Sequence, residues 1–411
     1  MSLKKISSTA AIASVLLLGN TVHAAEIGGI EVTGSGFATL GAGMMLNKQD
    51  GLASGYKKPF FVSDYAQGGV YESTSGLQWQ PDSKIGYQAV AKLPGSNFSL
   101  TGQVVARGSR NGEAAIEWLY GSYKLNDNYT LQVGRKRIPM FYYSDTQDVG
   151  LALPWTHLPS QLYGWEAVNY NGVNLSYQDQ WGSWSSAVNV MAGNEGRNDT
   201  GYWKVYSGKH SRTDSKWDQI VGGDITLSKG WFETRAVYLQ SNTRTKNSGV
   251  WDSNPGSAFG TYSPGDNVFS DPGTQKIYGL AFNIDYNNWF VRSEFVHINY
   301  NEEYGGADQA QIFGVGYRVG KWTPMATVAN YRAVATGSSE SDAQEAHRTT
   351  SLTLRYDLTT SSAIKVQYDY QKDLSGDKFT LDQKYGAPTV GASTNRFGDA
   401  RLLTVTYDTV F

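Results

Sequence analysis

Hydrophobic and polar residues alternate along much of this 411-residue chain with a period of two. The pattern is clearest at residues 401–411, where one face carries Leu403, Val405, Tyr407, Thr409 and Phe411. Successive side chains of a β-strand point to opposite faces, so this period predicts a strand with one largely apolar face. The same period recurs at residues 98–107, 278–286, 352–356 and 364–370. The chain is therefore predicted to be all-β.

Two kinds of connection separate these strands. Short turn-forming stretches, such as 94–97, 126–128 and 287–288, alternate with long polar stretches at 197–218, 244–275, 336–348 and 372–398. This asymmetry is typical of a transmembrane antiparallel β-barrel, with turns on the periplasmic side and long loops outside. We count about 16 strands, the size class of the porins. The predicted strands begin near residues 30, 83, 98, 114, 129, 167, 184, 219, 231, 276, 289, 309, 322, 349, 363 and 400. A soluble β-sandwich is the alternative.

The first 24 residues predict an export signal. Lys4 and Lys5 precede an apolar stretch at 10–19, and small residues at 22–24 suit cleavage before Ala25. The apolar stretch is too short to span a bilayer of about 30 Å, which argues against a helical anchor. The chain is thus divided into a cleaved signal peptide, residues 1–24, and a barrel domain, residues 25–411.

Composition narrows the function further. Loss of Lys4 and Lys5 leaves 33 basic against 37 acidic residues, a net charge of −4, so no basic excess points to nucleic acid. The chain has no cysteine, which excludes disulfides and thiolate chemistry. Its five histidines show no catalytic or metal-ligand spacing, and only His157 lies in a loop of special interest. We expect no metal, no cofactor and no enzymatic activity.

Three segments resemble a known family. Residues 82–88, then 117–123 running into 131–135, are similar to the early strands of Gram-negative general porins, where an acidic-aromatic-aliphatic-Gly strand is followed by one ending in Gly-Arg. The terminal Phe411, with Tyr407, resembles the signal by which the barrel assembly machinery reads outer-membrane barrels. After Arg137 the chain departs from the family, because residues 138–155 lack its Pro-Glu-Phe type tip.

The resemblance implies a homotrimeric, water-filled barrel among the lipids of the cell outer membrane. It also implies that the third external loop folds inward and sets acidic residues opposite a basic wall. Residues 139–164 occupy the position of that loop, and an aromatic run there does not suit a loop exposed to water. The alternative is that the loop caps the barrel or packs on a neighbouring subunit. The loop candidates for the constriction are Tyr142, Tyr143, Asp145, Asp148 and Trp155.

Alternation also predicts which charges face the lumen. Lys84, Arg107, Arg235, Arg355 and Lys365 fall on inward faces, because their neighbours in sequence carry the apolar outer face. The basic wall opposite the loop is then Lys84, Arg107, Arg135 and Arg137. Strict alternation points Arg135 outward, whereas the resemblance places it in the pore. The inward position requires a bulge or local twist near Gly134.

The leading hypothesis is a passive channel for ions and small hydrophilic solutes, narrowed by residues 139–164. A substrate-selective channel for sugars or small organic acids is the first alternative, because Phe141, Tyr142, Tyr143 and Trp155 could form stacking steps. An outer-membrane adhesin or enzyme is a weaker one. One weak feature favours a trimer: the small residues Gly34, Gly36, Ala38 and Ala42 share a face of the first strand.

Overall fold

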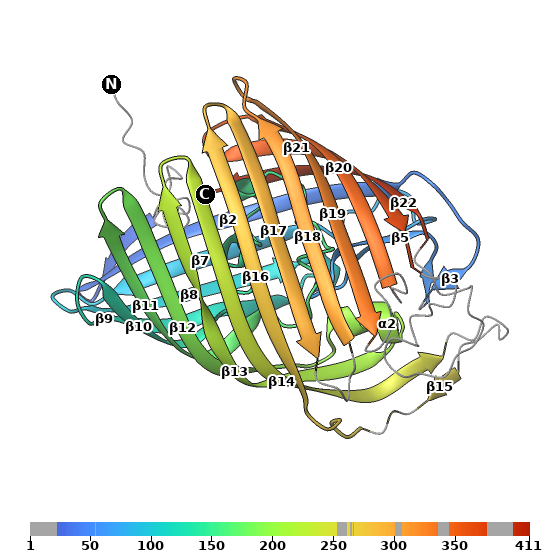
Figure 1. Cartoon of the computed structure of the whole chain (residues 1–411), viewed down its shortest axis with the longest axis horizontal. Coiled ribbons are helices and arrows are strands. Elements are labelled where there is room, and N and C mark those ends of the chain that lie inside the picture. Colours follow the sequence, from blue (N-terminus) through green and yellow to red (C-terminus); the bar gives the residue numbers. More distant parts are fainter. Residues whose placement is uncertain are drawn as a thin grey trace.

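The computed structural model is a closed antiparallel β-barrel whose wall has 16 strands (Figure 1). It describes residues 23–53, 55–252, 261–263, 265, 267–300, 306–335, 345–375 and 398–411. The wall strands are β2 (Ile30–Met45), β7 (Lys84–Lys92), β8 (Phe98–Arg107), β9 (Ala114–Lys124), β10 (Tyr129–Arg137), β11 (Asn169–Trp181), β12 (Trp184–Arg197), β13 (Arg212–Lys229), β14 (Phe232–Asp252), β16 (Gly273–Tyr286), β17 (Trp289–Tyr300), β18 (Gly306–Tyr317), β19 (Trp322–Ala335), β20 (Glu345–Asp357), β21 (Ser362–Asp373) and β22 (Ala400–Val410). The predicted fold and strand number are confirmed.

Each wall strand pairs with the next along the chain, and β22 returns to pair with β2. At this seam Phe37 is opposite Val410, and the pairing continues to Met45 opposite Leu402. The closed order leaves no free sheet edge in the wall. A barrel in lipid needs this closure, since unpaired N–H and C=O groups find no partner there.

A short strand, β1 (His23–Ile27), pairs with the first residues of β2 beyond the point where β22 stops. The predicted signal peptide, residues 1–24, lies outside the described residues except for positions 23 and 24. Cleavage after Ala24 therefore stays a prediction, as does the division into residues 1–24 and 25–411.

The two ends of the barrel differ as the sequence predicts. Short connections, such as 182–183 and 287–288, join strands at the end that carries the start of β2. Longer connections gather at the opposite end, near α2 (Gly201–Ser207) and β15 (Thr261–Ser263) (Figure 1). The strands run further at this end than predicted, because the β13–β14 pairing continues to Arg212 opposite Gly249.

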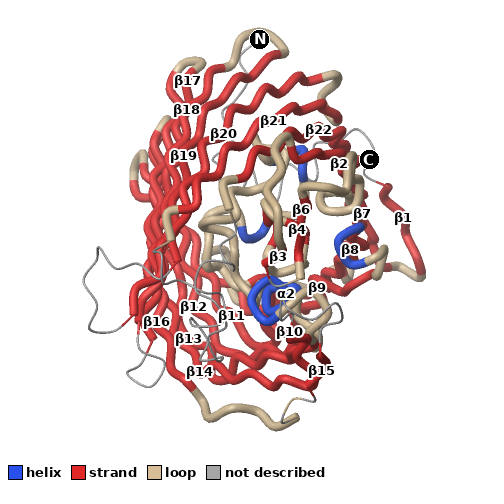
Figure 2. Tube along the Cα trace, turned by 90° about the vertical axis from the view of Figure 1, so that its right-hand side faces the viewer, coloured by secondary structure: helices blue, strands red, loops and turns tan. Residues whose placement is uncertain are grey.

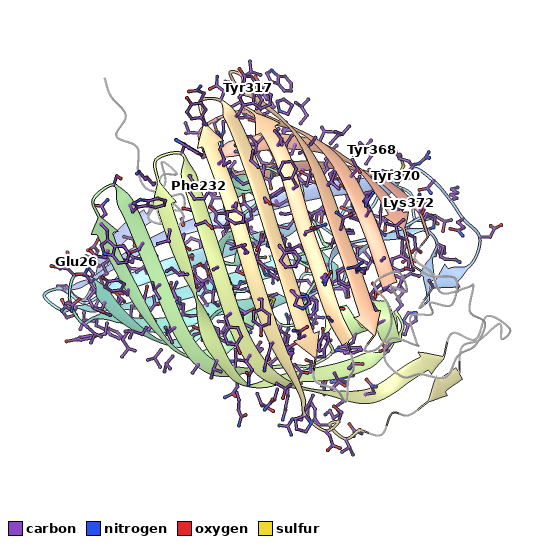
Figure 3. All side chains as sticks on the ribbon, in the orientation of Figure 1. Glu26, Phe232, Tyr317, Tyr368, Tyr370 and Lys372 are labelled. Carbon is purple, nitrogen blue, oxygen red and sulfur yellow. The ribbon has the colours of Figure 1, made fainter. Side chains whose placement is uncertain are left out.

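The outer face is largely apolar. Leu40 is 63% exposed and Leu352 57%, although both are large hydrophobic side chains. Aromatic residues collect near the short turns, where the rings of Trp289 and Tyr317 lie 4.8 Å apart, and Tyr317 projects at that edge (Figure 3). An apolar exterior edged by aromatic residues is typical of a membrane barrel. In the described part of the chain, no helix has the length and hydropathy that crossing a bilayer demands.

Loop 3, residues 138–168 between β10 and β11, lies inside the barrel (Figure 2). It includes two short 3-10 turns, η2 (Ser144–Thr146) and η3 (Gly150–Ala152). Its buried side chains form one apolar cluster with inner-face residues that come mostly from β13–β19. The loop members are Ile138, Met140, Phe141, Tyr143, Leu153, Trp155, Leu158, Leu162, Tyr163, Trp165 and Ala167. The predicted inward fold of this loop is confirmed.

The inner wall is not uniformly polar. On β14, β16, β17 and β18 the inner face carries Val237, Ile277, Val296 and Ile312, all buried beneath loop 3. These strands are apolar on both faces because one face meets lipid and the other meets the loop. Burying the loop's side chains inside the barrel requires an apolar surface of this kind.

A second cluster lies at the loop end of the barrel. Loop 1, residues 46–83, carries four short strands, β3 (Leu52–Ala53), β4 (Tyr56–Lys57), β5 (Phe60–Asp64) and β6 (Gly69–Glu72). Tyr56 and Phe60 of this loop pack with Tyr202 and Tyr206 of α2. Both were missed at the sequence level: α2 falls in the predicted polar connection 197–218, and no structure was predicted for residues 46–83.

Candidate functional site

A buried group of four charges fixes the first part of loop 3 to the wall. Arg107 binds Glu117 at 2.5 Å and Asp148 at 2.7 Å, while Arg137 binds Glu117 at 3.1 Å and also contacts Asp148. All four side chains are at least 93% buried. Two arginines from the wall thus face one carboxylate of the loop and one of the wall, so the charges balance.

The electrostatics explain why Asp148 stays ionised at this buried position. Burial alone raises the pKa of its carboxyl, but the guanidinium groups of Arg107 and Arg137 outweigh burial and hold the pKa well below its usual value. The sequence correctly predicted that Asp148 faces Arg107 and Arg137. Because these charges neutralise one another, Asp148 anchors the loop.

Arg135 does not join this group. Its two terminal guanidinium nitrogens bind the carboxylate of Glu195 at 2.7 and 2.9 Å. Gly134 has a φ of 135°, so the expected local twist exists, but β10 keeps an unbroken register with both neighbours. The bulge lies on β9, where Glu117 is the extra residue, and it supplies the partner of Arg137. The placement of Arg135 opposite the loop carboxylates is therefore corrected.

Other inward basic residues hold the main chain of loop 3. Lys365 donates to the carbonyl oxygens of Gly150 at 2.8 Å and Trp155 at 2.6 Å. Arg355 donates to the carbonyl of Leu151 at 2.7 Å, and Arg235 to those of residues 139 and 141 at 3.1 Å. Their inward position is as predicted. They supply donors to carbonyl groups of the loop, and each also pairs with a wall carboxylate, Lys365 with Asp408, Arg235 with Asp224 and Arg355 with Asp357.

The aromatic residues of the loop are divided between its two sides. Tyr143 and Trp155 are 8% and 0% exposed, and the Trp155 indole donates to the Thr327 hydroxyl at 2.9 Å. Both pack against the wall, away from the lumen, so the idea of aromatic stacking steps is wrong for these two and for the buried Phe141. Tyr142 alone of the run lies beside the open space, where its hydroxyl donates to a wall carboxylate.

A polar cavity of about 390 Å³ lies between loop 3 and the strands β2 and β7–β14. Asp145 is exposed toward it from the loop, opposite the wall residues Lys136 and Arg137. The remaining charged lining residues are Asp224, Glu233 and Arg235, and the aromatic ones are Trp118, Tyr120 and Tyr142. This cavity places both signs of charge around one open space.

A smaller space of about 40 Å³ lies beyond the loop, toward the long connections. It is lined by Lys84, Arg107 and Asp148 together with residues of loop 1. Lys84 points inward as predicted, and its ammonium donates to the carbonyl of Gln147 at 3.3 Å. Residues 142–148 of loop 3 therefore lie between the two spaces: Tyr142, Asp145 and Thr146 line the larger one, and Gln147 and Asp148 line the smaller one.

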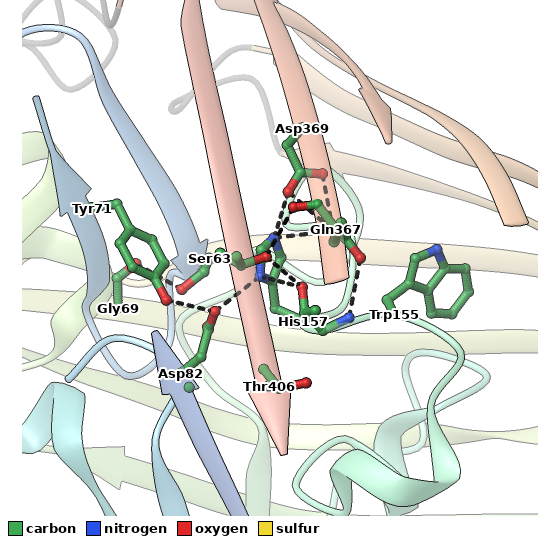
Figure 4. A network of polar contacts seen from close by, with 12 residues as sticks. Ser63, Gly69, Tyr71, Asp82, Trp155, His157, Gln367, Asp369 and Thr406 are labelled. Carbon is green, nitrogen blue, oxygen red and sulfur yellow. Dashed lines mark hydrogen bonds and ion pairs between the residues drawn. The ribbon is translucent and has the colours of Figure 1, made fainter. Parts of the chain in front are cut away.

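His157 ties loop 3 to loop 1 and to the wall (Figure 4). Its Nδ1 lies 3.1 Å from Asp82 of loop 1, and its Nε2 lies 3.4 Å from Asp369 of β21. Burial disfavours the charged ring, but the two carboxylates outweigh burial and raise the pKa of His157 to about 10. The ring is consequently a cation at neutral pH and bridges two anions, which is a structural role.

Asp82 is held ionised by the same contacts. Burial raises the pKa of this carboxyl, but His157 and the hydroxyl of Tyr71, which donates at 2.8 Å, lower it below its usual value. Among the described residues, no group of histidine and carboxylate side chains is arranged to hold a metal ion.

Tyr407 and Phe411 lie on the outer face, 38% and 42% exposed. The main chain of Phe411 exchanges two hydrogen bonds with Gly36, at 2.5 and 2.9 Å. A Cβ at Gly36 would lie 2.2 Å from the Phe411 ring, and one at Gly34 would lie 2.2 Å from the Tyr87 hydroxyl. The space left by these glycines is thus filled within the chain, which removes them as support for a trimer. The role of Tyr407 and Phe411 as an assembly signal stays a prediction.

Sequence reasoning missed Lys136, Trp118 and Tyr120, which line the cavity. Lys136 follows Arg135 in a run of basic residues, and strict alternation from Gln132 would have placed it inward. The bulge at Glu117 has no such signal, because a single inserted residue shows only through the pairing with the neighbouring strand.

Comparison with known proteins supports the fold. No protein-family model and no curated protein matches the sequence. Among solved structures, OmpT in trimer form, an outer membrane protein of Vibrio cholerae, superposes with a TM-score of 0.53, 11% identity and coverage of 93% of this chain and 99% of that one. The anion-selective porin from Comamonas acidovorans superposes with a TM-score of 0.53 and 12% identity, over 93% of this chain and 100% of that one. The outer membrane channel DcaP of Acinetobacter baumannii superposes with a TM-score of 0.53 and 11% identity, over 93% of this chain and 98% of that one. This chain therefore has the closed 16-stranded barrel fold of outer-membrane porins.

Proposed function

We propose that this protein is an outer-membrane channel through which ions and small hydrophilic solutes diffuse passively. One observation carries the proposal: a closed barrel with an apolar exterior holds, beside its inward loop, a polar cavity of about 390 Å³ lined by both signs of charge. Side chains of this kind replace the hydration shell of a passing solute better than an apolar wall does. The porin structures with the same fold support the proposal.

The proposed path is off-centre. It runs past residues 142–148, between loop 3 and the strands β2 and β7–β14, because loop 3 covers much of the inner face of β13–β19. Exposed Asp145 on the loop and half-buried Lys136 on the wall are the charges that we expect a solute to meet at this point. A field between opposite charges orients dipolar solutes and filters ions.

Single-channel recording in planar bilayers tests the proposal. The folded protein should give stable open steps, and Asp145→Trp should reduce the conductance because the indole fills the narrow part of the path. Asp127→Trp, in an exposed turn at the other end of β10, is the matched control and should conduct like the wild type. A folded barrel that stays closed under all voltages would contradict the proposed function.

A substrate-selective channel is the second candidate, and one observation favours it. The rings of Trp118 and Tyr120, whose centroids are 6.3 Å apart, line the cavity next to Lys136. Flat faces beside a cation suit a sugar or a small organic acid. A selective channel would show saturable current block by such a solute, whereas a nonspecific one would not, and Trp118→Ala would remove the block.

We further propose that the channel works as a homotrimer, as the resemblance to general porins implies and the trimer form of the Vibrio cholerae protein supports. Chemical cross-linking of the folded protein in detergent tests this assembly, with a ladder that ends at three copies as the expected result. A species that remains a single copy at all concentrations would contradict it. The proposal includes no enzymatic step.

A further inference from the structure

Two segments from separate parts of the wall meet across the long-loop end of the barrel. Loop 1 connects β2 to β7, whereas α2 lies between β12 and β13, and the strands β8–β11 separate their attachment points in the closed order. Figure 2 shows β3, β4, β6 and α2 inside the ring of wall strands. The contact between loop 1 and α2, here named the mouth junction, therefore crosses the lumen.

The mouth junction has an apolar centre. Phe60 of loop 1 is 0% exposed, and Tyr202 and Tyr206 of α2 are 6% and 4% exposed. These side chains pack on one another together with Tyr56. The ring of Tyr65 stacks on that of Tyr206 with centroids 6.0 Å apart. Aromatic side chains buried to this extent hold loop 1 and α2 together as one unit.

Main-chain and charged contacts also close the junction. A Cβ on Gly68 of loop 1 would lie 3.3 Å from the Cα of Gly201, so the two main chains are in contact. The ammonium of Lys209, which follows α2, binds the carboxylate of Glu72. Larger residues at the two glycines would push the segments apart, so the sequence specifies a junction without a gap at this point.

On one side, contacts from the junction reach β8 and β9. Arg110, in the connection that follows β8, donates to the main-chain carbonyl of Asp199 at 3.0 Å. In the same connection, a Cβ on Gly108 would lie 3.0 Å from the Cα of Gln80 in loop 1. The opening on this side of the mouth is therefore narrowed to contact distance at two points.

On the other side, the junction reaches β20. The hydroxyl of Tyr206 donates at 3.2 Å to the carboxylate of Glu345, a fully buried residue of β20. The indole of Trp203 in α2 donates to Glu166 of loop 3 at 2.5 Å. Since β14–β19 lie between β13 and β20 in the ring, the contact to Glu345 holds α2 across the lumen.

Little open space is left beneath the junction. The cavity between loop 1 and loop 3 has about 40 Å³ and is lined by Asp64, Lys84 and Asp148, whereas the cavity on the other side of loop 3 has about 390 Å³. A buried water needs roughly 10–15 Å³ of such volume, so about three waters fill the smaller cavity. The described residues thus restrict the lumen on the long-loop side of loop 3 more than on the other.

We infer that the mouth junction is a size filter of its own, which excludes larger solutes before they reach loop 3. The filter rests on the proposed channel function, since a solute that enters from the long-loop end meets the junction first. A structural brace is the competing explanation. The wall needs none at this place, because the pairing of β2 with β22 already closes the ring.

Thiol labelling tests this filter without the use of conductance, so a failure of the proposed channel function leaves the result interpretable. The chain has no cysteine, and Lys84→Cys places a thiol in the cavity between loop 1 and loop 3. The folded protein in detergent would react with maleimide-polyethylene glycols of increasing size, and we expect a size limit in this parent protein. Tyr202→Ala with Tyr206→Ala should raise the rate for excluded polymers at least about tenfold, because the junction loses its buried rings.

Three further variants complete the design. Asp127→Cys, in an exposed turn at the other end of the barrel, should react with every polymer and gives the rate for an unobstructed thiol. Trp79→Ala removes an exposed side chain of loop 1 outside the junction and should keep the size limit. Lys209→Gln breaks the ion pair with Glu72 but removes no ring, so its gain should be smaller than that of the double variant.

Two results would overturn the inference. The first is a parent protein that reacts with polymers of all sizes as fast as Asp127→Cys does. The second is a size limit that both the double tyrosine variant and Lys209→Gln leave unchanged, since the contact between loop 1 and α2 would then not set it. Far-UV circular dichroism checks that the double variant keeps its wall strands.

Discussion

The two halves of the inner wall solve different problems. On β7–β12 the lumenal side chains form a ladder of amides, in which Gln103 donates to Gln88 at 3.1 Å and Asn174 donates to Gln132 at 3.1 Å. On β13–β19 many of the corresponding side chains are apolar and buried beneath loop 3. The first half pairs its amides with one another beside the polar cavity. The second half is a hydrophobic core that happens to lie inside a barrel.

The difference between the two halves of the wall determines how loop 3 is held inside the barrel. In a uniformly polar lumen such a loop would be held only by ion pairs and hydrogen bonds at its edges. Here loop 3 buries an apolar side of its own and directs its polar residues, such as Asp145, toward the amide ladder. Loop 3 is therefore held by packing against an apolar core as well as by ion pairs and hydrogen bonds at its edges.

Truncation of the core should have the largest effect. Trp155→Ala removes a fully buried indole, and we expect the free energy of unfolding to fall by about 3–5 kcal/mol. Urea unfolding in detergent, followed by far-UV circular dichroism, measures this change. Trp79→Ala is the matched control, since this side chain is 60% exposed in loop 1 and should cost less than about 0.5 kcal/mol. Equal losses in the two variants would mean that loop 3 contributes no core.

Removal of the anchoring charge should rank second. Asp148→Asn keeps the shape of the side chain but leaves Arg107 and Arg137 with one buried carboxylate between them. We expect a loss of about 3 kcal/mol in the same unfolding assay, because an uncompensated buried charge remains. Arg107→Gln combined with Asp148→Asn should recover part of that loss. This account would be contradicted if the double variant lost more free energy of unfolding than the two single variants lose together.

The His157 bridge should make stability depend on pH at the alkaline end. Its pKa is raised from the usual value near 6.5 to about 10, so its contribution is full below about pH 6.5 and is lost as pH rises through about 10. Urea unfolding at about pH 7 and about pH 10.5 should therefore show a loss for the wild type that is smaller in His157→Gln. The same loss in both proteins would exclude the histidine as its source.

Substitution of the charges at the cavity should have the smallest effect on stability. It is also the most direct test of the polar half of the inner wall, on β7–β12. Asp145→Asn should lower the preference for cations and Lys136→Gln should raise it, each by about twofold, since a unit charge ~8 Å away in water contributes ~0.5 kcal/mol. Reversal potentials in a potassium chloride gradient measure the ratio. Both variants should unfold like the wild type. The proposed path would be contradicted if the two substitutions shifted the cation preference in the same direction.

The alternating pattern was sufficient for the wall of the barrel but not for its contents. Period-two alternation located all 16 strands because lipid imposes one apolar face on each of them. It did not predict the apolar inner face, although Val237 and Leu239 flank the outward Tyr238 and so make that stretch apolar on both sides. Such two-sided strands indicate burial on both faces, a signal that can be read from sequence.

The site was predicted in part for a related reason. Asp148, Arg107 and Arg137 could be paired because opposite charges on a loop and on inward wall positions attract, whatever the detailed path of the loop. Tyr143 and Trp155 could not be assigned to a side, since an aromatic residue serves equally well in a core or beside a solute. Arg135 depended on a bulge whose location is decided by the neighbouring strand.

The seam between β2 and β22 has a consequence for how the molecule is made. Phe37 is opposite Val410, so nearly the whole chain lies between the two strands that complete the ring. Contacts so distant in sequence form late and slowly. Until they form, β2 and the last strand paired so far each keep an unsatisfied edge, so the unclosed sheet can pair with other chains and aggregate.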